Sequence, residues 1–195
     1  MVLLVAVVLG LTSGFLRAKF SGRLYQAVEV RYFWLILAAF LPQFFAFYLP
    51  ATRSIFPDNW VPVVLIGSQL LLLLFAWLNR RLPGFWLLGL GLLANFIAIS
   101  LNGGMMPLMP ENAARLMPAD SSTTLQLGER VGFGKDILLE KANTRLWFLG
   151  DVFMLPEIFR YPLAFSIGDI LISTGAFWLL WRLGSPRQLS KEVLP

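Results

Sequence analysis

Two aspartates near the end of the chain are the residues whose type and spacing suggest chemistry. Asp169 lies inside the last apolar stretch, which starts at residue 162, and Asp151 lies eighteen positions earlier. A bilayer core strongly disfavours an ionised carboxylate, so a chain that keeps one there usually has a partner or a reaction for it. The pair is therefore a candidate site.

The segment between the two aspartates favours their close approach, because Pro156 and Pro162 allow the chain to reverse direction. Two adjacent carboxylates do not both ionise easily: one keeps a proton while the other accepts a proton from water, as in aspartic proteases. We therefore expect Asp151 and Asp169 to be catalytic. The alternative is structural: Asp169 accepts hydrogen bonds from backbone amides at the start of its helix, and Asp151 caps a short element after Gly150.

The composition is that of an integral membrane protein, with 57% hydrophobic and 14% charged residues and a mean hydropathy of +0.71. The chain has no cysteine and no histidine, which excludes disulfides, thiolate nucleophiles, imidazole metal sites and Ser/His relays. Carboxylates remain as acid–base groups, and we expect neither a metal nor a cofactor. The net charge of +5 forms no basic groove interleaved with aromatic residues, so no nucleic-acid partner is expected.

Five apolar runs predict five transmembrane helices in one membrane domain, residues 1–184. A span needs about 20 residues, and about 17 are tolerated, so the first run is marginal. It lacks the charge and cleavage site of a signal peptide, and its Gly10-x-x-x-Gly14 spacing is interpreted as helix packing. The five runs cover residues 2–16, 32–49, 61–78, 85–101 and 162–183.

The distribution of basic residues predicts the orientation of these helices. Nine basic residues against two acidic ones lie at one set of helix ends, which we therefore place in the cytoplasm of a bacterial plasma membrane. The opposite ends carry seven basic and eight acidic residues. The amino terminus is therefore expected outside, and the polar tail at 185–195 in the cytoplasm.

The outer segment, residues 102–160, is expected to form a small cap on the membrane surface. Its Asn-Gly-Gly start at residue 102, followed by Pro107, Pro110 and Pro118, predicts turns, and short strands are expected at 123–127 and 146–149. The glycine-rich stretch 128–135 ends in Gly-Lys but has five residues where a P-loop has four, so we interpret it as a solvated turn. Five outer methionines either line an apolar groove or pack in the ordinary way.

Two asparagines are candidates for substrate binding near the aspartates. Asn95 is a polar residue inside the fourth apolar run, and Asn102 follows it by seven positions, two helical turns. Both side chains can therefore point along one helix face toward the outer surface.

The last spans resemble those of signal peptidase II, the lipoprotein signal peptidase family. The final helix of that family carries Phe-Pro-Ala-Phe-Asn-x-Ala-Asp-Ser-x-Ile-x-x-Gly, and residues 161–175 here run Tyr-Pro-Leu-Ala-Phe-Ser-Ile-Gly-Asp-Ile-Leu-Ile-Ser-Thr-Gly. Residues 91–97, Gly-Leu-Leu-Ala-Asn-Phe-Ile, are similar to the family's Gly-x-Leu-Gly-Asn-x-Ile motif. The chain as a whole also looks like an uncharacterised family of small bacterial membrane proteins.

This resemblance implies a four-helix core with one added amino-terminal helix. It implies that Asp151 and Asp169 take the places of the two catalytic aspartates and that Asn95 orients the site. Ser166 stands where that family has an asparagine, which implies contact with substrate. The resulting hypothesis is an aspartate peptidase that cleaves a membrane-anchored or lipidated peptide, such as a lipoprotein precursor, at the outer surface. The alternative is a non-catalytic subunit or scaffold of a larger membrane complex.

Overall fold

The computed structural model describes residues 2–22, 25, 29–116, 126–156, 158 and 162–183. The expected strand at 123–127 falls mostly outside these residues, and the polar tail at 185–195 does so entirely. The described chain is mostly helical, with four short strands.

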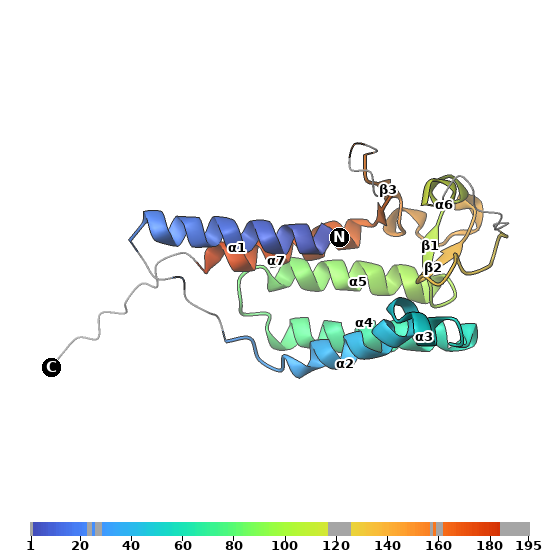
Figure 1. Ribbon diagram of the computed structural model, residues 1–195, viewed down its shortest axis with the longest axis horizontal. Coiled ribbons are helices and arrows are strands. Elements are labelled where there is room, and N and C mark those ends of the chain that lie inside the picture. Colours follow the sequence, from blue (N-terminus) through green and yellow to red (C-terminus); the bar gives the residue numbers. More distant parts are fainter. Residues whose placement is uncertain are drawn as a thin grey trace.

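Five longer helical segments lie side by side along the molecule (Figure 1). Each packs on its neighbour in the order α1, α7, α5, α4, α2, so chain ends that are distant in sequence meet in the first pair. α2 continues directly into a π-helix, η1, and contains Pro42. The helices are α1 (Val2–Phe20), α2 (Trp34–Gln43), η1 (Phe44–Tyr48), α4 (Val61–Leu78), α5 (Phe85–Leu101) and α7 (Ile167–Arg182).

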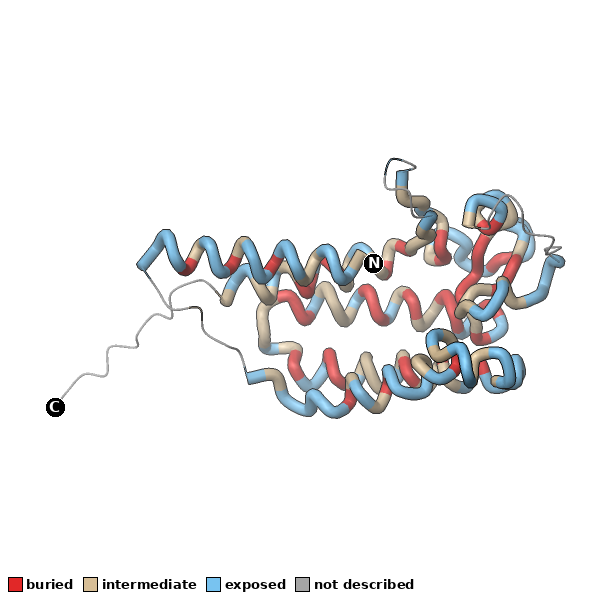
Figure 2. Tube along the Cα trace, in the orientation of Figure 1, coloured by how far each residue is buried: buried red, intermediate tan, exposed pale blue. Residues whose placement is uncertain are grey.

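Two of these segments are long and apolar enough to cross a membrane, by length and composition alone. Among the described residues they are Val2–Phe20 and Asp58–Leu78, and two shorter apolar helices cover Trp34–Tyr48 and Phe85–Leu101. Buried residues line the inward sides of the helices, and the outer faces are exposed (Figure 2). Many exposed residues are large and apolar, including Leu4, Val63 and Trp86.

The last helix begins later than the apolar run suggests. Residues 162–183 were expected to be one span, but Ala164–Phe165 forms the short strand β4, which pairs antiparallel with β3 (Phe153–Met154). α7 starts only at Ile167, because Ser166 caps it. Asp169 therefore lies in the first helical turn and not deep in a helix.

The segment between α5 and α7 forms a cap at one end of the helices (Figure 1). In it, β1 (Met106–Leu108) pairs in parallel with β2 (Asp136–Leu138), and α6 (Pro110–Leu116) follows β1. The strand expected at 146–149 is wrong: Leu146 has a φ of 49°, and Trp147–Leu149 forms a 3-10 turn, η4. A run of four apolar residues does not by itself distinguish a strand from a turn, and here only Leu149 packs against the core. The remaining short elements are α3 (Pro50–Arg53), η2 (Asp58–Trp60) and η3 (Lys141–Asn143).

Glycines allow the closest helix contacts. A Cβ atom at Gly10 would lie 3.0 Å from the Leu180 Cβ, and one at Gly14 would lie 2.6 Å from the Leu180 carbonyl oxygen. These two glycines therefore serve in packing against α7, as predicted. On its other side α7 meets α5 equally closely, since a Cβ at Gly91 would lie 2.5 Å from the Gly168 carbonyl oxygen. This contact brings the start of α7 to the middle of α5.

Candidate site between the helices and the cap

Asp169 occupies the third position of α7 and forms a reciprocal capping box with Ser166. The Asp169 backbone N–H donates to Ser166 Oγ at 3.1 Å, and the Ser166 backbone N–H donates to Asp169 Oδ2 at 3.0 Å. Both bonds satisfy amides that have no partner within the helix. This is the structural arrangement that the alternative interpretation predicts for Asp169.

Asn95 of α5 completes a closed ring of hydrogen bonds with these two residues. Its Nδ2 donates to Asp169 Oδ1 at 3.1 Å, and Ser166 Oγ donates to Asn95 Oδ1 at 2.9 Å. Ser166 is fully buried and Asn95 nearly so. Gly168 makes room for the ring, because any Cβ there would overlap the Asn95 side chain. Three of the five predicted site residues are therefore brought together.

Asp151 lies beyond this ring, in the cap after η4. Its backbone N–H donates to the Pro107 carbonyl at 3.1 Å, which joins it to β1. Its side chain is only 2% exposed, and Lys135 Nζ donates to its Oδ2 at 2.5 Å. The other carboxylate oxygen, Oδ1, is buried and makes no hydrogen bond within the described part of the chain. A buried oxygen of this kind can hold or release a proton.

Lys135 is the site residue that the sequence interpretation missed. The stretch 128–135 does form turns, but its last residue directly precedes β2, and its carbonyl accepts the Met106 amide at 3.0 Å. Its ammonium bridges Asp151 and Asp136, with 2.9 Å to Asp136 Oδ1, and its side chain is 42% exposed. The sequence does show Lys135 beside Asp136 at the start of a short apolar segment. The positive charge of Lys135 is opposite to that of the two predicted aspartates, and this was the signal that could have identified it.

The two aspartates interact through their charges and not by a hydrogen bond. Burial raises the pKa of Asp151 to about 7, Lys135 opposes this shift, and the charges of Asp136 and Asp169 reinforce it. Burial acts to lower the pKa of Lys135, but Asp136 and Asp151 outweigh it and raise that pKa above its ordinary value. No hydrogen bond joins the two carboxylates in the described chain; each has the separate partners given above.

Asn102 lies apart from the ring and ties α5 to the cap. Its Oδ1 accepts the Arg145 amide at 2.9 Å, and its Nδ2 donates to the carbonyls of Arg145 and Ala98 at 2.9 and 2.8 Å. These bonds occupy both amide hydrogens. A role for Asn102 in substrate binding stays a prediction, whereas its role in joining helix and cap is visible.

Two of the outer methionines belong to the apolar core. Met106 is buried in the core with Val61 and Ile99, and Met105 packs beside it, so these two methionines pack in the ordinary way. Within the described residues, no group of three or more Asp, Glu, His or Cys side chains could hold a metal ion.

Comparison with known proteins agrees with the expectation of an uncharacterised family. The model of a family of unknown function, DUF5317, matches residues 27–181. An uncharacterized protein of Thermotoga maritima is 28% identical over 133 residues, which cover 68% of this chain and 70% of that protein. No solved structure matches the chain significantly.

Proposed function

The chain belongs to the DUF5317 family of unknown function, and from its site we propose an aspartate-dependent hydrolase of the bacterial plasma membrane. The substrate is a membrane-anchored or lipidated peptide. Asp151 and Asp169 supply the acid–base chemistry, and Asn95 positions Asp169. The likeness to signal peptidase II is part of this proposal, in which α2, α4, α5 and α7 take the places of that family's four spans.

The proposal includes five membrane spans with the cap outside. It is supported by the arrangement of charged loops: the end of α1, the α4–α5 turn and the end of α7 lie together, opposite the cap (Figure 1). These ends carry Arg17, Lys19, Arg80, Arg81 and Arg182. A cytoplasmic excess of basic residues is the usual pattern in membrane proteins. The exposed apolar faces of the helices then face lipid (Figure 2).

The observation that carries the proposal is the state of the Asp151 carboxyl. It is buried, one of its oxygens makes no hydrogen bond to the described residues, and its pKa is raised to about 7 by burial. A group that titrates near neutral pH can both give and accept a proton during a reaction. The charge of Asp169 adds to this rise, after the effects of burial and of Asp136.

In the proposed reaction, water adds to the peptide carbonyl while its proton passes to Asp169. Protonated Asp151 then donates its proton to the leaving nitrogen as the carbon–nitrogen bond breaks. In this proposal the peptide approaches where the helices meet the cap, on the side of the half-buried Asp169. Lys135 supplies the balancing charge when Asp151 is left ionised.

The test replaces each aspartate singly and separates folding from processing. We expect Asp151→Asn and Asp169→Asn to fold in detergent and to lose precursor cleavage by about 100-fold or more, the usual effect of removing an acid–base group. Glu129→Gln is the control, because it removes an exposed carboxylate of the cap, and it should leave cleavage unchanged. Mass spectrometry of membrane lipoprotein precursors measures processing. Folded variants that leave precursor levels unchanged would reject the hydrolase.

A second candidate, a scaffold subunit of a membrane complex, is favoured by the capping box. Both carboxylate oxygens of Asp169 accept hydrogen bonds within the chain, so this residue already stabilises the start of α7. In this case Asp169→Asn disturbs assembly, and no precursor accumulates. Co-purification of partner subunits with the unmodified chain, and their loss from the variant, distinguishes the scaffold from the enzyme.

A further inference from the structure

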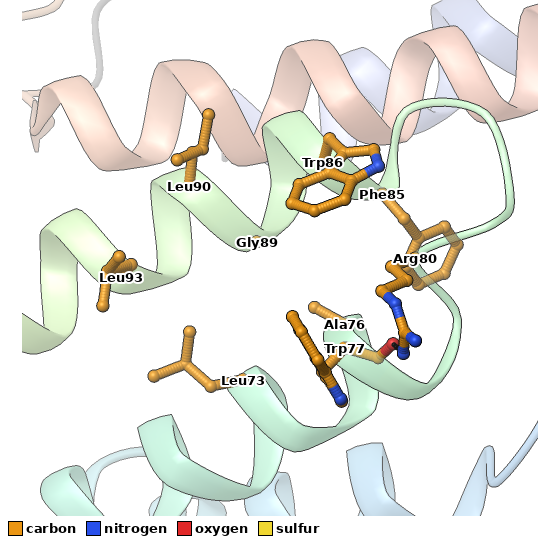
Figure 3. A pocket seen from close by; sticks show the side chains of 9 residues that line it. All are labelled: Leu73, Ala76, Trp77, Arg80, Phe85, Trp86, Gly89, Leu90 and Leu93. Carbon is orange, nitrogen blue, oxygen red and sulfur yellow. Dashed lines mark hydrogen bonds between the residues drawn. The ribbon is translucent and has the colours of Figure 1, made fainter.

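A pocket of about 200 Å³ lies between α4 and α5, at the end of the molecule opposite the cap. Leucines from both helices form its walls, and Trp77 and Trp86 flank it where the helices approach their connecting turn (Figure 3). The two tryptophans are 58% and 63% exposed. The pocket therefore opens on the outer surface of the bundle and is not an internal void.

Two small residues keep this pocket hollow. Gly89 of α5 faces Ala76 of α4, and a Cβ atom at Gly89 would lie 3.6 Å from the Ala76 Cβ, an ordinary contact distance. The backbone thus tolerates a side chain at Gly89, but a larger one would occupy the pocket. The apolar lining and the open side suit a flexible hydrocarbon chain.

A positive charge lies at the turn end of the pocket. The Arg80 guanidinium lies over the Trp77 ring, 4.2 Å from its centroid, and its Nη1 donates to the Trp77 carbonyl at 3.1 Å (Figure 3). Within the described chain Arg80 forms no ion pair. Arg81 follows it, and the turn 79–84 contains no acidic residue. Among the described residues, the Arg80 charge therefore has no acidic partner at this end of the pocket.

We propose that this pocket binds an anionic phospholipid of the cytoplasmic leaflet. One acyl chain lies between α4 and α5, and the headgroup phosphate accepts hydrogen bonds from Arg80. A guanidinium suits phosphate because its planar donors match two phosphate oxygens, and tryptophans favour the headgroup level of a membrane. The assignment of the leaflet rests on the membrane orientation proposed above, but the site is separate from the aspartates.

Charge selectivity is tested with the full chain purified in detergent. Native mass spectrometry measures binding of phosphatidylglycerol and of phosphatidylcholine with identical acyl chains. We expect phosphatidylglycerol to bind more tightly and Arg80→Gln to weaken it about fivefold, the usual effect of one basic residue near an anionic lipid. Arg81→Gln, which removes the same charge outside the pocket lining, should weaken binding less than Arg80→Gln does. Equal binding of both lipids, or equal effects of the two variants, overturns the proposal.

The acyl-chain part of the site is tested by filling the pocket. Gly89→Leu should abolish tight phosphatidylglycerol binding, whereas Gly67→Leu, which fills a different groove, between α2 and α4, should not. Thermal unfolding shows whether each variant is folded. Unchanged binding by folded Gly89→Leu rejects the site. Asp151→Asn should bind lipid normally, so failure of the hydrolase and failure of the lipid site give different results.

Discussion

Asp151 titrates differently in the folded and unfolded chain, and this makes stability depend on pH. Burial raises its pKa from the ordinary 3.8 to about 7. Between these values the folded state holds a proton that the unfolded state has lost, so raising the pH lowers the free energy of unfolding. The stabilisation is complete below about pH 4 and lost above about pH 7. In Asp151→Asn we expect the melting temperature, measured in detergent, to fall less between about pH 4 and about pH 7 than it does in the unmodified chain. An equally steep fall in the variant would contradict this.

The Lys135 ammonium is the charge that makes an ionised Asp151 tolerable in the cap. Lys135→Met keeps most of the side-chain volume but leaves a buried carboxylate without its cation. Because the lysine side chain is 42% exposed, water partly replaces it, and the loss in the free energy of unfolding at pH 8 should be about 2 kcal/mol. At pH 5, where Asp151 keeps its proton, the loss should be smaller. Denaturant unfolding at both pH values measures this difference.

The matched control for this change is a second lysine of the cap. Lys141→Met removes only a contact with the Trp147 ring, whose centroid lies 3.7 Å from the ammonium, and should cost less than about 1 kcal/mol. A loss at Lys135 that does not depend on pH would show that the lysine stabilises the cap by some means other than its charge.

At the scale of helices, the α5–α7 contact holds the polar ring in place. A Cβ atom at Gly168 would overlap Asn95 and lie 2.7 Å from the Gly91 carbonyl oxygen. Gly168→Ala should therefore lower the free energy of unfolding by about 2 kcal/mol through overpacking. Gly67→Ala, in open space on α4, should be neutral or stabilising because alanine favours helix. Thermal unfolding compares the two variants. An equal change in melting temperature would mean that the α5–α7 contact at Gly168 has room for a methyl group.

The sequence predicts some of these elements well and others poorly, for physical reasons. Apolar runs without internal breaks give the bounds of α4 and α5, because composition alone decides them. The start of α7 does not follow from hydropathy, since the capping box and not the apolar run sets it. The pairing of β1 with β2 joins segments about 30 residues apart, and no local pattern indicates it.

The residues of the candidate site also differ in how well the sequence predicts them. Asn95, Ser166 and Asp169 belong to local patterns on two neighbouring helices, so they can be found from the sequence. Lys135 reaches Asp151 across sixteen positions that contain β2 and two 3-10 turns. A lysine beside an aspartate does not by itself indicate a second partner that far along the chain. The fold of the cap depends on contacts between distant segments. The pairing of Lys135 with Asp151 in the cap is therefore visible only in the structure.

At the scale of the whole molecule, the two ends differ in charge and in structure, and this predicts the orientation. In the proposed five-span topology the cap lies outside and the α4–α5 turn lies in the cytoplasm. The chain has no cysteine, so single cysteines report accessibility without background. In intact cells we expect a membrane-impermeant maleimide to label Glu129→Cys in the cap and to miss Arg81→Cys until the membrane is opened. Both positions are exposed in the fold, so protein burial does not limit labelling. Labelling of Arg81→Cys alone in intact cells would invert the topology and move the aspartates to the cytoplasmic side.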